Sequence, residues 1–326
     1  MIRYATIGTN FIVDRFLAPA IQNKDLHYGA VYSRNEETAT AFAAKYHVDK
    51  IYTDLEELAA ADDIDAVYIA SPNSLHYQQA ALMLAHKKHV LCEKTITSNV
   101  RELEHLIELA KANEVVLLEA MHSVHTPGFA AIVNHLPKLG TLRRATFQYC
   151  QYSSRYDKFK NGIIENAFDP SFSNGALMDI GVYCIHPLLR LFGMPKEIKS
   201  DALLLHNGID GAGTILASYE ELQAELIYSK ITDNRLPSQI QGEQGTMLIN
   251  GINIPHEITF IDRTGREEVI YSTDSTADMS CEIKEWVRLI REDPGYSIHN
   301  QYSHMALSLM DQARTQMGIR FPADTK

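Results

Sequence analysis

The stretch that decides the fold is YATIGTNFIVDRF, which runs from Tyr4 to Phe16. A short apolar run ends at Gly8, and a second apolar stretch with helical spacing follows Asn10. This order of strand, glycine turn and helix is typical of the start of a dinucleotide-binding unit, whose usual fingerprint is G-x-G-x-x-G or G-x-G-x-x-A. Here Asn10 stands at the second glycine and Val13 at the third position. The first question is therefore whether this loop still binds a dinucleotide.

The altered loop keeps the features that binding requires. Gly8 preserves the tight turn, and asparagine tolerates left-handed backbone better than most residues with a side chain. The start of the helix would still present free N–H groups to a phosphate. We therefore predict that the loop binds a dinucleotide through Gly8, Thr9, Asn10, Phe11 and Ile12. The alternative is an ordinary strand–turn–helix corner without a ligand.

Strand and helix patterns alternate over the first 120 residues. Apolar runs predict buried strands at Ile2–Ile7, Leu26–Tyr32, Ala66–Ala70, His89–Cys92 and Val115–Glu119. Helical spacing predicts helices at Ile12–Gln22, at Glu36–Tyr46, in a short segment capped by Thr53, at Ser74–Ala85 and at Val100–Ala112. Such alternation with short links is typical of crossover units on a parallel sheet, whose ligands bind beyond the carboxyl ends of the strands.

The pattern changes after about Met121. Short strands separated by turn residues are predicted at 144–152, 215–219, 222–231, 239–241, 246–249 and 256–261, and helices at 176–192, 279–291 and 301–317. We therefore predict an α/β protein with two domains. Residues 1–121 form a Rossmann domain with a doubly wound parallel sheet, and residues 122–326 form an α/β domain with an open, mainly antiparallel sheet. The helix at 301–317 is a candidate to pack back on the first domain.

Composition argues against several classes of protein. The 326 residues carry 30 basic and 41 acidic side chains, a formal net charge of −11, which argues against a nucleic-acid surface. The four cysteines are far apart without C-x-x-C spacing, so we expect no disulfide framework, no zinc site and a cytoplasmic location. We also expect no secretion signal and no membrane span, because no apolar run reaches about 18 residues.

The residues after the second predicted strand indicate the preferred cofactor. NAD-specific sites place a carboxylate at the end of this strand to bind the ribose hydroxyls. Here the chain reads Tyr32-Ser33-Arg34-Asn35, and no carboxylate appears before Glu36. Ser33 and Arg34 suit a 2′-phosphate, because a guanidinium binds phosphate well and can also stack on adenine. We predict NADP rather than NAD; an exposed loop arginine that faces only solvent is the alternative.

The loop after the strand at 66–70 is also expected to face the cofactor. Ser71-Pro72-Asn73 stands at the carboxyl end of this strand, where Pro72 stiffens the loop and Asn73 offers its amide to the cofactor. His76, on the first turn of the following helix, is expected to support the same site. The alternative is a plain helix start that is capped by Ser74.

Glu93-Lys94 is the centre of the predicted active site. The pair follows the apolar strand His89–Cys92 directly, at the edge of the sheet where ligands bind. The Lys94 ammonium can hydrogen-bond a substrate oxygen, and Glu93 can orient it or bind the cofactor ribose. A lysine after a strand is more often an exposed loop residue, so this hypothesis depends on the neighbouring motifs.

A second group of polar residues lies on the helix predicted at 176–192. Asp179 and Tyr183 are four residues apart, and Tyr183 and His186 are three apart, so helical spacing places each pair on one face. A carboxylate can bind a sugar hydroxyl, and a phenol or imidazole can exchange the proton of an alcohol. We predict Asp179 and His186 as substrate contacts; for His186 a buried core histidine is an equal alternative.

Two other clusters of polar residues have a composition that function could use. His122 and His125 have a spacing that a metal site can use, but no carboxylate or third histidine stands at metal spacing, so we predict no metal. A tyrosine-rich cluster follows the first predicted strand of the second half and consists of Tyr149, Tyr152, Arg155 and Tyr156. It can line a carbohydrate site, and sheet packing or a subunit interface is equally consistent with it.

Taken in order, these stretches resemble the Gfo/Idh/MocA oxidoreductases, the group of glucose–fructose oxidoreductase and inositol dehydrogenase. The resemblance covers nearly the whole chain and rests on Ile7-Gly8-Thr9, Ser33-Arg34, Asp65–His76, Cys92-Glu93-Lys94, Glu119-Ala120-Met121 and Gly175–Tyr183. It implies a Rossmann domain, a second domain with an open antiparallel sheet, bound NAD(P), and hydride transfer on a sugar-like or polyol-like alcohol or carbonyl.

The resemblance also implies roles for single residues. It makes Tyr183 the proton-transfer residue and Asp179 the partner of the catalytic lysine, Lys94. It places His76 near the nicotinamide, and it favours NADP where Ser-Arg follows the second strand. The family motif is Glu-Lys-Pro, whereas Thr95 follows the lysine here, so we expect a less constrained loop.

We therefore predict an NADP- or NAD-dependent oxidoreductase that acts on a sugar, a polyol or a related small carbonyl and forms a homodimer or homotetramer through its second sheet. Two alternatives stay open: the departures from the family at Asn10, Thr95 and Val124 favour the first, and the resemblance itself suggests the second. A non-catalytic NAD(P)-binding regulatory protein would bind cofactor without turnover. A lyase or epimerase would oxidise its substrate transiently and give product without a net change in cofactor absorbance.

Overall fold

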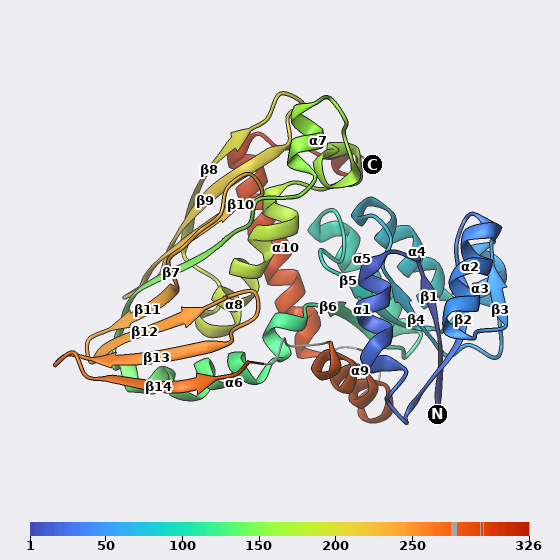
Figure 1. Ribbon diagram of the computed structural model, residues 1–326, viewed down its shortest axis with the longest axis horizontal. Coiled ribbons are helices and arrows are strands. Elements are labelled where there is room, and N and C mark those ends of the chain that lie inside the picture. The colour runs from blue at the N-terminus through green and yellow to red at the C-terminus, as the bar shows by residue number, and fades with distance from the viewer. Residues whose placement is uncertain (275–278, 294, 296, 326) are drawn as a thin grey trace. The chain divides into compact units, whose positions relative to one another are not determined.

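The parallel sheet expected in the first half of the chain is present. The structure, a computed structural model, describes residues 1–274, 279–293, 295 and 297–325. The chain groups into two units: unit 1 is Met1–His122 with Asp278–His304, and unit 2 is Ser123–Ala277 with Met305–Lys326. The boundary after His304 falls inside the last long helix, α10 (Ile298–Met317). Figure 1 shows the elements of both units, which are described in turn.

Six parallel strands form the sheet of unit 1 in the order β3-β2-β1-β4-β5-β6. Their bounds are β1 Ile2–Ile7, β2 Leu26–Tyr32, β3 Lys50–Tyr52, β4 Ala66–Ile69, β5 His89–Glu93 and β6 Leu117–Ala120. The strand order reverses between β1 and β4, and this switch point is where doubly wound sheets bind ligands. The sequence pattern does not predict β3, because it is only three residues long and partly exposed.

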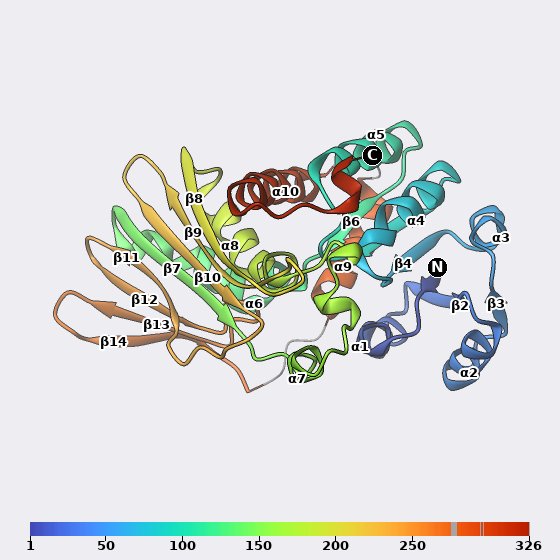
Figure 2. The same cartoon turned by 90° about the horizontal axis from the view of Figure 1, so that it is seen from above.

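Helices cover both faces of this sheet. Their bounds are α1 Phe11–Ala20, α2 Glu36–Tyr46, α3 Leu55–Ala60, α4 Asn73–Ala85, α5 Val100–Ala112 and α9 Ser280–Glu292. Figure 2 shows α4 and α5 on one face and α1 and α2 on the other. The cap predicted at Thr53 is wrong by one residue, because the Asp54 carboxylate accepts the Glu56 N–H at 2.7 Å and starts α3.

An aromatic core joins α1 to the sheet. Phe16 of α1 stacks on Tyr68 of β4 with ring centroids 3.8 Å apart and meets Tyr4 of β1 edge-on at 5.9 Å. Val13 is fully buried in the same cluster, to which Trp286 of α9 also belongs. Burying one large apolar side chain contributes roughly 1.5–3 kcal/mol. Packing therefore fixes α1 against the sheet although Val13 replaces the third glycine of the fingerprint.

Eight strands form the sheet of unit 2 in the order β14-β13-β12-β11-β7-β10-β9-β8. Their bounds are β7 Leu142–Cys150, β8 Glu197–Leu204, β9 Asp210–Ser218, β10 Gln223–Ser229, β11 Ser238–Gly242, β12 Gly245–Asn250, β13 Glu257–Asp262 and β14 Glu267–Ser272. Only β7 and β10 pair in parallel, and the other neighbours are antiparallel. The sequence pattern misses β8 and β14, the two edge strands, because β8 has a single buried residue and β14 has none among its described residues, so neither leaves a buried apolar run.

Helices of unit 2 lie on one face of its sheet. Their bounds are α6 Pro127–His135, α7 Tyr156–Lys160 and α8 Val182–Phe192, with a π-helical turn at Leu177–Gly181 and 3₁₀ turns at His122–His125, Leu136–Leu139, Asn166–Phe168, Pro170–Phe172 and Pro322–Thr325. Gln316 of α10 fixes this helix to β8, since its amide donates to the Ile198 carbonyl oxygen at 3.0 Å. In the part of the unit that the structure describes, no helix lies over the opposite face (Figures 1 and 2).

The two sheets confirm the predicted fold class, a doubly wound parallel sheet followed by a mainly antiparallel one. The sequence pattern does not predict α6 and α7, and it extends one continuous helix over Ala176–Phe192 where a π-helical turn precedes α8. Among the described residues, no helix combines the length and the apolar character that crossing a membrane requires.

Candidate active site

The loop after β1 retains the tight turn of a dinucleotide site. Gly8 has φ +117°, a conformation that residues with a Cβ rarely adopt, and a Cβ there would lie 3.0 Å from the Ala70 carbonyl oxygen. Its N–H donates to the Tyr32 carbonyl oxygen at 3.2 Å. The loop backbone thus lies against the ends of β2 and β4, at the carboxyl edge of the sheet where a ligand would approach.

Asn10, at the position of the second glycine, makes two side-chain hydrogen bonds that the sequence alone does not show. Its φ of −85° and ψ of 175° are extended, so the expected use of left-handed backbone is wrong. The side-chain oxygen caps α1 by accepting the Ile12 N–H at 2.9 Å, and the side-chain amide donates to the Ala70 carbonyl oxygen at 2.7 Å. Asn10 therefore fastens the loop to the end of β4, while Phe11 beside it is 63% exposed.

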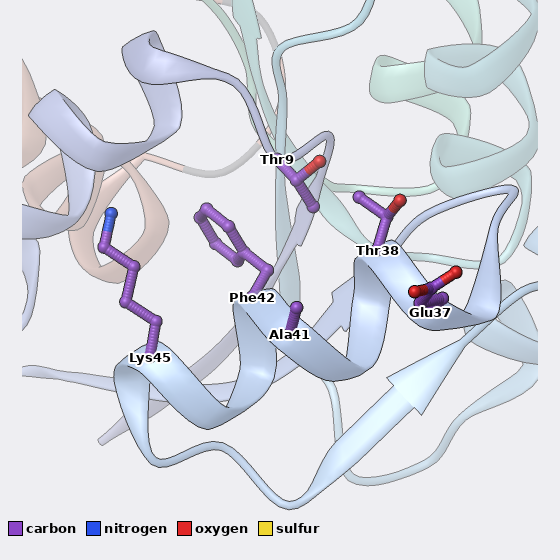
Figure 3. Close-up of a pocket in the computed structure, with 6 residues that line it drawn as sticks. All are labelled: Thr9, Glu37, Thr38, Ala41, Phe42 and Lys45. Carbon is purple, nitrogen blue, oxygen red and sulfur yellow. The ribbon is translucent and has the colours of Figure 1, made fainter.

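A cavity of about 440 Å³ opens beside this loop. Figure 3 shows Thr9 of the loop facing the surface of α2, from which the other five lining residues come: Glu37, Thr38, Ala41, Phe42 and Lys45. The ammonium of Lys45 is 2.8 Å from an Asp14 carboxylate oxygen and is therefore paired. The cavity therefore lies between Thr9 of the predicted phosphate-binding loop and α2, the helix that follows Ser33 and Arg34.

Ser33 and Arg34 lie between β2 and α2. Ser33 hydrogen-bonds through its N–H to the Tyr52 carbonyl oxygen at 3.1 Å. Asn35 caps α2, because its side-chain oxygen accepts the Thr38 N–H at 2.8 Å. Arg34 is exposed between these two anchored neighbours. Its side chain is thus accessible in the segment that joins β2 to α2, the helix that lines the cavity.

The loop after β4 is fixed by His76. Its Nε2 lies 2.8 Å from the Ser71 carbonyl oxygen and its Nδ1 lies 3.0 Å from the Thr95 carbonyl oxygen. Burial lowers the pKa of His76, which favours the neutral ring. Pro72 is the N-cap residue of α4 and no side chain caps the helix, so the alternative of a Ser74 cap is wrong. His76 therefore supports the site by linking two loops.

Glu93 is the last residue of β5 and is buried. Its carboxylate accepts a hydrogen bond of 2.5 Å from the Tyr68 hydroxyl, and burial raises its pKa. Lys94 follows half-buried, and the Lys94–Thr95 peptide bond is cis. The predicted Glu-Lys pair is thus anchored to the aromatic core through Tyr68.

The segment after Lys94 is held firmly although it lacks the proline of the family. Thr95 is buried, and the Ile96 N–H donates to a Glu119 carboxylate oxygen at 3.1 Å. The other Glu119 oxygen accepts a hydrogen bond of 2.5 Å from Ser303 of α10, within unit 1. The expectation of a less constrained loop is therefore wrong, because side-chain hydrogen bonds replace the restriction that proline would give.

His122 and His125 stand at the two ends of the 3₁₀ turn His122–His125. Burial lowers the pKa of His122 to about 4, so its ring is neutral at neutral pH. Among the described residues, no group of three or more His, Cys, Asp or Glu side chains is arranged to hold a metal ion. The geometry thus gives no support for a metal at this segment.

In unit 2 the structure adds a residue that the sequence reasoning missed. Lys230 follows β10 directly and is 2% exposed, and its ammonium nitrogen lies 2.9 Å from an Asp179 carboxylate oxygen. Asp179, on the π-helical turn, keeps 33% of its side chain exposed. The sequence did not single it out, because the strand predicted at 222–231 extends over Lys230, whereas β10 ends at Ser229.

Asp210 of β9 anchors the same turn. Its carboxylate accepts the Leu177 N–H at 2.6 Å, and burial raises its pKa to about 6. Gly175, at φ +135°, has no Cβ because one would lie 2.0 Å from the Asp210 carboxylate. The start of the helix that carries Asp179 and Tyr183 is therefore set by a buried carboxylate from a strand.

The raised pKa of Asp210 predicts a pH dependence of stability. The native state binds more protons than the unfolded state between pH 3.8 and about 6, so stability falls as pH rises through this window. A difference of about two pKa units corresponds to roughly 3 kcal/mol. Asp210→Asn lacks this titration, so the free energy of unfolding of wild type relative to this variant should fall from pH 4 to pH 6 and then level. Urea unfolding of both proteins measures it; a pH-independent difference would contradict the assignment.

Tyr183 of α8 is half-buried and meets Tyr149 of β7 edge-on, with ring centroids 5.5 Å apart. Tyr152 and Tyr156 instead group with α7, where the Lys160 ammonium lies over both rings. The predicted tyrosine cluster is thus divided. His186 is almost fully buried, which favours the alternative of a core histidine over a substrate contact.

The predicted site residues fall into two sets. The residues predicted to bind the cofactor all belong to unit 1 and stand at or after the carboxyl ends of β1, β2, β4 and β5, and Lys94 belongs to this set. Asp179, Tyr183 and His186 belong to unit 2, where they share one helical segment. Sequence reasoning missed Asp210 and Lys230, and it named Glu119 as part of a motif without giving it a contact; the partners of all three are distant in the chain.

Both halves of the chain are similar to known oxidoreductases. A family model described as "Oxidoreductase family, NAD-binding Rossmann fold" matches residues 2–121, and one described as "GFO/IDH/MocA C-terminal domain" matches residues 137–248. The chain is 50% identical over 326 residues to a scyllo-inositol 2-dehydrogenase (NADP(+)) of Bacillus subtilis, with 99% of each chain covered. It is 40% identical over 329 residues to an uncharacterized oxidoreductase of Escherichia coli, with 100% of this chain and 99% of the relative covered.

A solved structure supports the fold. The chain resembles a 3-ketoreductase from Actinomadura kijaniata in complex with NADP and TDP-benzene, with a TM-score of 0.87, 21% identity and 98% of each chain covered. At this identity the likeness bears on the fold alone. Together with the family matches, it confirms the predicted family resemblance and architecture.

Proposed function

The chain belongs to the GFO/IDH/MocA family of oxidoreductases, and we propose on this premise that it is an NADP-dependent dehydrogenase acting on a hydroxyl of a polyol. The observation that carries the proposal is the 50% identity, over the whole length of both chains, to a dehydrogenase named for scyllo-inositol and NADP(+). The proposed substrates also include sugars and, in the reverse direction, related small carbonyls. The reaction is a hydride transfer between a CH–OH group and the nicotinamide.

The residues at the edge of the unit 1 sheet fit such a cofactor. Gly8 leaves open the space that a Cβ would fill, and Thr9 lines a cavity of about 440 Å³ beside α2. We place the pyrophosphate at the loop of Thr9, Asn10, Phe11 and Ile12, and the adenosine half in the cavity. Ser71, Pro72, Asn73, His76 and Glu93 support the nicotinamide half in this proposal.

Arg34 and Ser33 are assigned to the 2′-phosphate that distinguishes NADP from NAD. The exposed guanidinium and the absence of a carboxylate at the end of β2 support this assignment. We expect Arg34→Ala to raise the Kd for NADPH about 10- to 100-fold, the loss of a charge-assisted hydrogen bond, and to change the Kd for NADH less than about twofold. Fluorescence titration measures both constants.

The control for this variant is Arg263→Ala, which removes another exposed arginine from the turn between β13 and β14. It should leave both Kd values unchanged. Equal weakening of NADPH and NADH by Arg34→Ala would show that Arg34 does not distinguish the two cofactors.

The protein residues then handle the proton of the substrate. Bound NADP⁺ supplies the hydride acceptor, and reduction of a ketone runs in reverse. We propose that Lys94 donates a hydrogen bond to the reacting oxygen and that Asp179 accepts one from a substrate hydroxyl. Tyr183 relays the hydroxyl proton as the carbon loses hydride: its oxygen accepts the proton from the substrate while its own proton passes to solvent, so the C–H and O–H bonds break and a C=O bond forms.

The first experiment is a titration with NADPH and NADH followed by turnover assays with NADP⁺ on a panel of inositols, other polyols and sugars. Tight NADPH binding with reduction of NADP⁺ by a polyol supports the proposal. Tight binding without turnover across the panel would favour the regulatory alternative. Product formed without a net absorbance change at 340 nm would favour a lyase or epimerase that uses transient oxidation.

We also propose that the protein is a cytoplasmic homodimer or homotetramer that associates through the sheet of unit 2. Leu203, Leu216 and Val269 are exposed, and the strand register places them on the sheet face that the described helices leave open. The four cysteines form no disulfide, which fits a reducing compartment. Sedimentation velocity of the wild type and of Leu216→Lys tests the interface, since a buried lysine there should favour the monomer.

A further inference from the structure

We propose that Lys230 is a positioning residue, whose ammonium keeps the Asp179 carboxylate ionised and fixed in one orientation toward the substrate. This inference rests on the proposed function, because Asp179 is the carboxylate that we assign to a substrate hydroxyl. Lys230 itself is not expected to touch substrate or cofactor, since it is 2% exposed.

The Lys230 ammonium contacts a carboxylate, a backbone carbonyl oxygen and an aromatic ring. Its ammonium nitrogen lies 2.9 Å from Asp179 Oδ2 and donates to the Ala167 carbonyl oxygen at 2.8 Å. The Phe168 ring lies beneath it, with the centroid 5.0 Å from the nitrogen. A buried ammonium is unfavourable unless acceptors or an opposite charge compensate it, and an ionised Asp179 supplies the negative charge in this set of contacts.

Lys230 influences a second carboxylate, and the two have different tasks. Asp210 is buried and bonds the Leu177 N–H, and the positive charge of Lys230 also favours its ionised form. Asp179 remains one-third exposed and can accept a ligand. The buried Tyr228 hydroxyl is a further titratable group that interacts with Asp210. Asp210 therefore fixes the backbone of the turn, while Lys230 fixes the side chain that the turn presents.

The chemical consequence concerns which hydrogen bonds Asp179 can make. An ionised carboxylate only accepts, so it binds a hydroxyl that donates and leaves the oxygen of that hydroxyl free for another donor. Without the lysine, a partly buried carboxyl is protonated more easily and can turn away from this geometry. The lysine thus maintains the acceptor that orients the polyol.

The chain offers a matched control. Lys88 is also a buried lysine, but its ammonium donates to two backbone carbonyl oxygens, those of Ala61 at 2.6 Å and Ile64 at 2.8 Å. It lies in unit 1 and does not form an ion pair with a carboxylate among the described contacts. Lys88→Met therefore loses a buried ammonium without affecting Asp179.

The test compares Lys230→Met, Lys230→Arg, Asp179→Asn, the double variant Lys230→Met/Asp179→Asn and Lys88→Met. For Lys230→Met we expect a Kd for NADPH within about twofold of wild type and a loss of kcat/KM of about 100-fold, the size expected from misplacement of a site group. The acid limb of its pH–rate profile should move to higher pH. Lys230→Arg should recover part of the activity and the wild-type acid limb.

The double variant decides whether the lysine acts through Asp179. If it does, Lys230→Met adds less than about twofold to the loss that Asp179→Asn already causes. Lys88→Met should lower the unfolding temperature and leave kcat/KM and the pH profile unchanged. Losses that multiply in the double variant, or a Lys230→Met enzyme with wild-type kcat/KM and pH profile, would overturn the inference.

Urea unfolding of the same variants gives a readout that does not need activity. Coupling between Lys230 and Asp179 predicts that the double variant is destabilised by less than the sum of the two single variants. Additive destabilisation would overturn the inference even if the enzyme has no assayable substrate. A wild-type protein that binds NADPH but oxidises no polyol, with coupling present, would contradict the proposed function and leave the Lys230–Asp179 pair established.

Discussion

Lys94→Met should lower kcat by about 10³-fold and leave the Kd for NADPH within about twofold of wild type. Methionine has nearly the length of lysine and removes the ammonium that we assign to the reacting oxygen. The surrounding segment should keep its structure, because its hydrogen bonds do not involve the lysine side chain. His76 bonds the Thr95 carbonyl oxygen, and the Ile96 N–H donates to the Glu119 carboxylate. Steady-state kinetics with the best polyol of the panel and fluorescence titration measure the two constants.

Lys24→Met is the control for this variant, because Lys24 is an exposed lysine of the same unit. It should change neither kcat nor the Kd. Wild-type turnover in Lys94→Met would remove Lys94 from the mechanism. A parallel loss of NADPH binding would instead show that the lysine holds the cofactor, and the proton chemistry would then depend on unit 2 residues alone.

Much of unit 1 could be predicted from sequence because its strands are buried on both faces. Such strands leave continuous apolar runs, and the helices between them show an amphipathic period. The predicted bounds of Leu26–Tyr32, Glu36–Tyr46 and Val100–Ala112 match β2, α2 and α5. The edge strands β8 and β14 carry no such signal, since exposed positions on both faces admit polar residues.

The site was less predictable than the fold because its geometry depends on partners far apart in sequence. The sequence locates Asn10 but does not show that its amide reaches Ala70, which explains why a residue with a side chain can replace the second glycine. The sequence shows that the proline is missing after Lys94. It does not show that the Ile96 N–H donates to the Glu119 carboxylate and so holds the same segment. Motifs therefore identify the positions, and the hydrogen bonds that hold them require the structure.

Gly175→Ala is the substitution with the largest expected effect on stability. The new Cβ would lie 2.0 Å from an Asp210 carboxylate oxygen, and the backbone angle φ of +135° is strained for any residue but glycine. Moving the Asp210 carboxylate would also weaken its hydrogen bond to the Leu177 N–H. The backbone strain and the lost buried hydrogen bond together should lower the free energy of unfolding by about 4 kcal/mol.

Gly162→Ala separates the clash from the backbone strain. Gly162 also has positive φ, +81°, but a Cβ there would meet no atom within 4 Å. Alanine at 162 should therefore lower the free energy of unfolding only by the backbone strain, about 1–2 kcal/mol, and leave kcat unchanged.

Gly175→Ala should also reduce kcat, because the Asp179 N–H donates to the Gly175 carbonyl oxygen at 3.1 Å and the turn that presents Asp179 would shift. Urea unfolding and kinetics of the two variants measure the difference; equal destabilisation would show that the Asp210 contact does not set the geometry of the turn.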